Sequence, residues 1–158
     1  MSQSELQNLL ERDRELLDEL TGLLEKERVS LESRNLGDLD GILQQKQSVL
    51  TNIEGNDQKR RQLLLKAGVP ENQTSIAQLS ALIGRESDAR LHDLLDSIKQ
   101  RLNNCRELSE TNRIIVHRSQ VNTQRALDIL RGNENAEKLY NRHGSRLTAS
   151  QRRNLGQA

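Results

Sequence analysis

The sequence has 158 residues, a formal net charge of +1, 30% charged residues and 1% aromatic residues. A net charge so near zero gives no overall field to attract a nucleic acid or a membrane. With no Trp, no Phe and one Tyr, the chain lacks the aromatic bulk of a thick globular core. Leu, Ile and Val spread among polar residues favour long amphipathic helices that pack along narrow seams. We therefore expect an all-α fold.

The first predicted helix covers residues 3–33. Ser2 and Glu5 have the spacing of a capping box, which marks a helix start. Apolar residues then recur at gaps of three and four, as on one face of a helix: Leu6, Leu9, Leu10, Leu16, Leu17, Leu20, Leu23, Leu24 and Leu31. The stretch "RNLGDLDG" follows, with Gly37 as the turn signal and Asp38 as the expected cap of the next helix.

The second predicted helix covers residues 38–67. "GND" at 55–57 weakens the middle of this single helix and leaves room for a kink, because Gly costs about 1 kcal/mol against Ala inside a helix. Gly68 and then Pro70 end the helix. A short helix at 75–83 follows, with Ser75 and Gln78 as a second capping box.

The third long helix is predicted at 87–131, and Gly132 ends it. Its near-heptad seam lasts for about 45 residues, or roughly 65 Å. Because short connections make successive helices antiparallel, residues 1–132 are predicted to form one helical domain. We expect an elongated, coiled-coil-like antiparallel bundle of three long helices plus the short one. Residues 133–158 are rich in Asn, Arg, Ser and Gly, so a flexible tail is expected.

Two apolar strips follow the last third of this helix, "NRIIVHRSQVNTQRALDIL". One continues the seam and is diluted by Asn112, Ser119 and Asn122. The other consists of Ile114 and Val121, seven residues apart and roughly opposite the seam. Single exposed aliphatic residues are common on protein surfaces. A helix that stays apolar beyond its packing partners nevertheless favours a surface for another protein's amphipathic helix.

No pattern in the sequence indicates catalysis, a cofactor or a metal, so an enzyme is not expected. His92, His117 and His143 show no ligand spacing with the single Cys105, which is interpreted as a small core residue. Phosphate-binding loops and catalytic elbows are absent from the sequence. The first residues carry no apolar run typical of a signal peptide, and one cysteine fits a reducing compartment, so a cytoplasmic protein is expected.

The order of these elements resembles the FlgN family of bacterial flagellar export chaperones. Residues "LLDELTGLLEKERVSLESRNLGDLDGILQQKQSVLTNIEGNDQKRRQLLLKAG" resemble the N-terminal helical hairpin of that family. "NRIIVHRSQVNTQRALDIL" followed by "LYNRHGS" resembles its last helix and its tail motif. Asn141 stands where the family usually has the first glycine of that motif, while Gly144 is kept. Asn tolerates left-handed backbone better than most residues, so the turn is expected to survive.

The resemblance implies a cytoplasmic chaperone that binds hook-associated junction proteins through their helical C-terminal segments. Such a chaperone prevents their premature assembly and delivers them to the flagellar type III export apparatus. The resemblance also implies a role for Tyr140 in docking at the membrane export gate. It further implies substrate contacts at these residues: Ile114, Ile115, Val116, Val121, Ala126, Leu127 and Leu130. Asn112, Ser119 and Asn122 would limit affinity and fix register, as polar seam residues do in coiled coils.

Two other classes of protein are weighed against this one. A structural coiled-coil protein would homodimerise through the same apolar strip, and self-association in the absence of a client is compatible with both classes. A helical protein that binds nucleic acid would use the basic tail, which carries Lys138, Arg142, Arg146, Arg152 and Arg153. The near-neutral net charge and the single aromatic residue make this class the weakest, and no nucleic-acid partner is expected.

Overall fold

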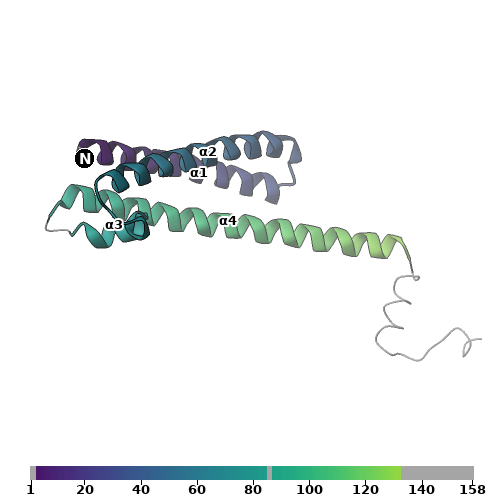
Figure 1. Ribbon diagram of the computed structural model, residues 1–158. Helices are drawn as coiled ribbons and strands as arrows, with labels where there is room; N and C mark the ends of the chain where they lie inside the picture. Colours follow the sequence, from purple (N-terminus) through teal and green to yellow (C-terminus); the bar gives the residue numbers. More distant parts are fainter. Residues whose placement is uncertain (1–2, 85–86, 133–158) are drawn as a thin grey trace, which may run out of the picture. The chain divides into compact units, whose positions relative to one another are not determined.

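The computed structural model describes residues 3–84 and 87–132, and all regular structure in these ranges is helical. The helices are α1 (Gln3–Glu32), α2 (Leu36–Lys66), the 3₁₀ turn η1 (Glu71–Gln73), α3 (Ile76–Leu82) and α4 (Ala89–Leu130), shown in Figure 1. The predicted all-α fold with a long last helix is therefore confirmed. The chain divides into two compact units, Met1–Ile115 and Val116–Ala158, and their boundary falls within α4. A bundle of three long helices over 1–132 stays a prediction.

Polar contacts within the first unit define the directions of its long helices. Asn56 Nδ2 donates to Leu9 O at 2.9 Å, while Lys46 Nζ donates to Glu27 Oε1 at 3.0 Å. As the residue numbers rise along α1 they fall along α2, so these two helices are antiparallel. Along α4 they rise together with those of α1. Arg101 Nε donates to Asp18 Oδ1 at 2.8 Å, and Asn112 Nδ2 donates to Leu24 O at 2.9 Å. The first part of α4 thus runs parallel to α1.

The core of the first unit is made almost entirely of aliphatic side chains. Helix α1 contributes the largest share, because its apolar residues recur at three and four and face both α2 and α4. The fully buried side chains include Leu10, Leu16, Leu24, Leu64, Leu79, Leu95 and Ile98. Full burial of a leucine contributes about 1.5–3 kcal/mol relative to an exposed one. The core is therefore a set of leucine seams, as the composition predicts.

The connection between α1 and α2 differs from the prediction. Gly37 and Asp38 lie inside α2, and the turn is made instead at Arg34, whose φ of 55° is left-handed. The backbone N–H of Asn35 donates to Ser30 O at 3.0 Å, which closes the end of α1. Asn35 precedes α2, and its side chain donates to Asp38 Oδ2 at 3.0 Å rather than capping the backbone. The turn predicted at Gly37 therefore lies at Arg34, three residues earlier in the chain.

Two other local predictions have clear outcomes. Gly68 follows α2 with a φ of 86°, which confirms the predicted end of that helix. Ser75 Oγ accepts from the backbone N–H of Gln78 at 3.3 Å, which confirms Ser75 as the cap at the start of α3. The single helix predicted across Gly55 is confirmed, because α2 is continuous through it. The next turn of α2 carries the buried side chains of Asn56 and Arg60, which are anchored on α1. These contacts offset the low helix propensity of glycine.

Candidate functional site

A buried polar cluster joins α1 to α2 in the middle of the hairpin. Asp13 accepts hydrogen bonds from Arg60 and, at 2.6 Å, from Asn56 Nδ2. Arg60 also pairs with Asp57, which in turn forms an ion pair with Arg61, whose Nε lies 2.7 Å from Asp57 Oδ2. Burial raises the pKa of the Asp13 carboxyl above 3.8, and the Arg60 charge and the Asn56 hydrogen bond counteract that rise. The cluster is a structural ion pair inside a leucine seam.

A second polar cluster joins α1, α2 and α4. Glu27 accepts from Lys46 Nζ at 3.0 and 3.1 Å. The Asn112 amide nitrogen of α4 donates to Glu27 Oε2 at 3.0 Å and to Leu24 O at 2.9 Å. Asn112 is only 3% exposed, and its Oδ1 is buried with no hydrogen-bond partner among the described residues. We call Glu27, Lys46 and Asn112 the distal polar layer, and Asp13, Asn56 and Arg60 the proximal polar layer.

The buried face of α4 ends at Asn112. Its buried residues are Leu91, Leu94, Leu95, Ile98, Cys105 and Asn112, and none of residues 113–130 is buried. This last stretch of 18 residues is about 27 Å of helix. It contains all seven predicted substrate contacts. Ile115 is half-buried, and the other six are exposed, with exposed fractions that rise to 82% at Leu130.

The seven residues fall on two sides of α4. At about 100° per residue, five of them lie within about 60° of the direction of Asn112: Ile115, Val116, Ala126, Leu127 and Leu130. We call these five the seam-side strip. The remaining two, Ile114 and Val121, lie roughly opposite, as the sequence predicts. One partner helix covers only about a third of the circumference of another, so the two sides cannot share a single partner helix.

Asn112 departs from the role expected of it. The sequence groups it with Ser119 and Asn122 as a polar residue that would meet a partner. In the structure the Asn112 side chain is buried and donates its hydrogen bonds to α1 of the same chain, whereas Ser119 and Asn122 are exposed. The sequence also gave no role to Glu27 and Lys46, which complete the layer. The sequence did carry a signal for these polar clusters. Along the apolar face of the first helix, positions seven residues apart alternate between leucine and an acidic residue: Leu6, Asp13, Leu20 and Glu27.

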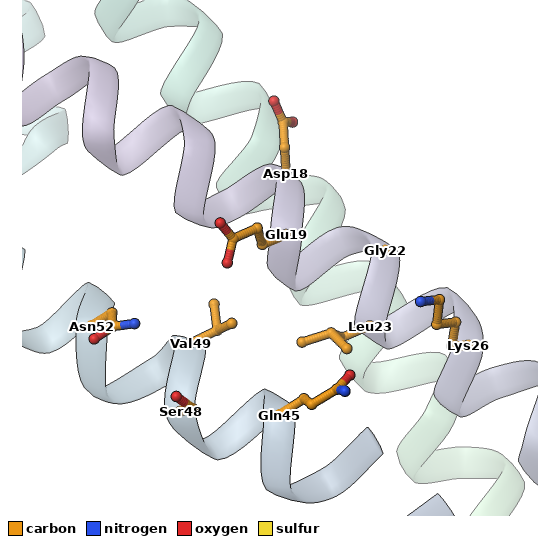
Figure 2. A pocket seen from close by; sticks show the side chains of 9 residues that line it. All are labelled: Asp18, Glu19, Gly22, Leu23, Lys26, Gln45, Ser48, Val49 and Asn52. Carbon is orange, nitrogen blue, oxygen red and sulfur yellow. The ribbon is translucent and has the colours of Figure 1, made fainter. Parts of the chain in front are cut away.

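A groove of about 440 Å³ runs between α1 and α2, and Figure 2 shows it. Leu23 and Val49 point toward each other between the two helices, and Asp18, Glu19 and Lys26 lie along α1. None of the seven predicted contacts lines this groove. Its charged rim and narrow apolar floor are what two antiparallel helices with aliphatic contact residues leave between them.

Cys105 is buried against α1, as a small core residue should be. Its Sγ lies 3.3 Å from Thr21 Oγ1 and 3.7 Å from Leu17 O. Burial raises the pKa of the Cys105 thiol, so its reactive thiolate is scarce at neutral pH. The cysteine thus belongs to the packing of α4 on α1.

Within residues 3–84 and 87–132, no group of three His, Cys, Asp or Glu side chains is placed to hold a metal ion. His92 Nδ1 lies 3.3 Å from Asp96 Oδ2, a contact between residues four apart on one face of α4. No helix in the same two ranges is long and apolar enough to cross a membrane. Tyr140, Asn141 and the rest of the tail lie outside the described residues.

The family described as FlgN protein matches residues 1–148 of the chain. No curated protein and no solved structure matches it. The matched range takes in the hairpin, α3, α4 and the region of Tyr140.

Proposed function

Because the chain belongs to the FlgN family, and so has a flagellar chaperone role, we propose that it binds hook-associated junction proteins in the cytoplasm before their export. It prevents their premature assembly and delivers them to the flagellar type III export apparatus. The observation that supports this proposal is the stretch of α4 after Asn112, which carries eight apolar residues, the seven predicted contacts and Ile129, and buries none of them. Five of them lie on one side of the helix, the seam-side strip, and exposed apolar residues grouped on one side of a helix are typical of protein-binding sites.

The client segment is proposed to be an amphipathic helix laid along this part of α4. Helix-on-helix recognition uses apolar side chains at spacings of three, four and seven, and the seam-side strip has Val116 and Leu127 eleven residues apart, which is three helical turns. A client that is unfolded before assembly loses conformational entropy when it folds onto the chaperone. That cost keeps the affinity moderate, which suits a client that must be released for export.

Binding is tested with the full-length chain and a synthetic peptide of the C-terminal segment of a hook-associated junction protein from the same bacterium. We expect a micromolar complex, about −8 kcal/mol, with a gain of helical circular dichroism over the sum of the separate spectra. A peptide of the same composition in scrambled order is the control. The proposal fails if the authentic peptide binds no better than the scrambled one.

A homodimeric coiled-coil protein is the second candidate, because the same exposed strip fits a second copy of α4. Analytical ultracentrifugation with and without the peptide separates the two candidates. A chaperone gives a complex with the peptide, and any dimer dissociates as the peptide is added. A tight dimer that neither binds the peptide nor dissociates in its presence identifies the structural coiled-coil protein.

Tyr140 is proposed to dock at the membrane export gate, as its place in the family's tail motif implies. Tyr is favoured at binding hot spots because it combines a large apolar ring with a hydroxyl. Tyr140→Ala is expected to leave peptide affinity unchanged and to lower junction-protein secretion about tenfold, corresponding to 1.4 kcal/mol of lost docking energy. Secretion is measured in cells and peptide binding in vitro. Tyr140→Phe is the control, and equal loss of peptide binding in Tyr140→Ala would contradict a separate docking role.

A further inference from the structure

We propose that Asn112 is a positioning residue. With Glu27 and Lys46 it fixes the register of α4 on α1 and ends the buried face of α4. The apolar residues after it consequently stay available to a client. This inference rests on the proposed function and adds to it the element that decides which part of α4 a client meets.

The hydrogen bonds of Asn112 allow one register. The heptad series on the buried face of α4 is Leu91, Ile98, Cys105 and Asn112, and the next heptad position is the exposed Ser119. Within this series only the amide nitrogen of Asn112 carries the two donors that Leu24 O and Glu27 Oε2 accept at 2.9 and 3.0 Å. A slip of one heptad would bring Cys105 or Ser119 to these acceptors, with one weak donor or one hydroxyl. The distal polar layer thus excludes neighbouring registers.

Stability alone does not explain a polar residue at this position. Asn112 is 3% exposed, and its Oδ1 is buried without a partner in the described part of the chain, which is a cost. Buried ionic groups replaced by well-packed apolar ones often leave a protein equally or more stable. An apolar residue here would join the half-buried Leu108 and Ile115 into one unbroken seam. Asn112 interrupts that seam three residues before Ile115.

The test uses Asn112→Leu in the full-length chain with the junction-protein peptide described above. We expect the melting temperature to stay equal or rise, and amide hydrogen exchange of the residues just after 112 to slow about tenfold as the seam extends. Peptide affinity should fall about tenfold, because less of α4 is free to bind. A merely structural role would not move stability and binding in opposite directions.

The proximal polar layer offers a matched control. It lies in the same leucine seam, with Asp13 two heptads before Glu27, or about 21 Å along α1. The variant Asp13→Leu/Asn56→Leu/Arg60→Met removes a comparable polar cluster without touching α4. It is expected to keep peptide affinity within twofold. An equal loss of affinity in this control would overturn a specific role for the distal layer.

Two further outcomes decide the proposal. Slower exchange after residue 112 with unchanged peptide affinity would show that Asn112 does not set the client-accessible stretch. Should Asn112→Leu fail to fold because Glu27 loses a donor, the variant Glu27→Leu/Lys46→Met/Asn112→Leu removes every member of the layer and is measured in its place. If the wild-type chain does not bind the peptide, the proposed function fails by itself, while exchange and melting still test the register.

Discussion

Replacing Val116 and Leu127 with aspartate is expected to weaken client binding at least a hundredfold, about 2.7 kcal/mol, while the chain keeps its helical circular dichroism. Both side chains lie on the seam-side strip, and their exposed fractions are 38% and 40%. A client helix on this strip would cover them, and each new carboxylate would lose its water without gaining a partner. Binding is measured by calorimetric titration of the junction-protein peptide.

A matched control lies on the other side of the same helix. Ile114 and Val121 are 39% and 37% exposed, so Ile114→Asp/Val121→Asp removes similar apolar area from equally accessible positions. The two double variants also change net charge and helix propensity almost equally. We expect the control to lose less than threefold in affinity, because a client on the seam-side strip does not reach the opposite side of the helix.

The reverse pattern would be equally informative. If the Ile114 and Val121 variant loses binding and the Val116 and Leu127 variant keeps it, the client lies on the side opposite Asn112. Loss of helicity in either variant would show that the mutated residues support the fold. Equal loss in both, with helicity intact, would indicate that the client surrounds α4.

Arg60→Ala is expected to lower the free energy of unfolding by about 3–5 kcal/mol, a large share of the total for a chain of this size. The side chains of Arg60 and Asp13 are 5% and 7% exposed. Removing the guanidinium leaves the Asp13 carboxylate buried with only the Asn56 amide at 2.6 Å as a remaining partner. Urea denaturation followed by circular dichroism gives the change.

The same variant should show a characteristic pH dependence. The folded-state pKa of Asp13 already lies above 3.8 because of burial, and loss of the Arg60 charge raises it further. The carboxyl therefore binds a proton more readily in the folded than in the unfolded chain, and acid favours the folded state of the variant. Its stability deficit should shrink as the pH falls from 7 toward 4. A deficit that grows with acidity would contradict this account of the cluster.

A control separates the loss of an ion pair from the loss of packing. Asp13→Leu/Arg60→Met removes both charges, so no unpaired carboxylate is left, and its stability should equal or exceed that of the wild type. Asp57 then keeps Arg61, whose Nε lies 2.7 Å away, and Asn56 keeps Leu9 O. A loss as large as that of Arg60→Ala would mean that the shape of the arginine matters more than its charge.

The sequence by itself determined the helical class and most helix ends of this protein. Leucine spacings of three and four allow only one kind of buried face, and the absence of aromatic bulk leaves only thin seams. Gly68 and Ser75 act through their own backbone and hydroxyl, so their end signals do not depend on distant residues. The same local logic found the apolar stretch of α4, because helical geometry alone places Ile114 and Val121 together.

Tertiary structure decided which polar residues are internal. A heptad pattern gives the direction of Asn112 on its helix but not what lies opposite, and that depends on Leu24 and Glu27, more than 80 residues away. The turn at Arg34 lies outside the glycine signal, and α2 runs unbroken through Gly55, beside which Asn56 and Arg60 are anchored on α1. A local sequence signal such as a glycine gives only the backbone conformation that the residue itself favours. Burial of a charge or an amide is decided only when another helix supplies its partner.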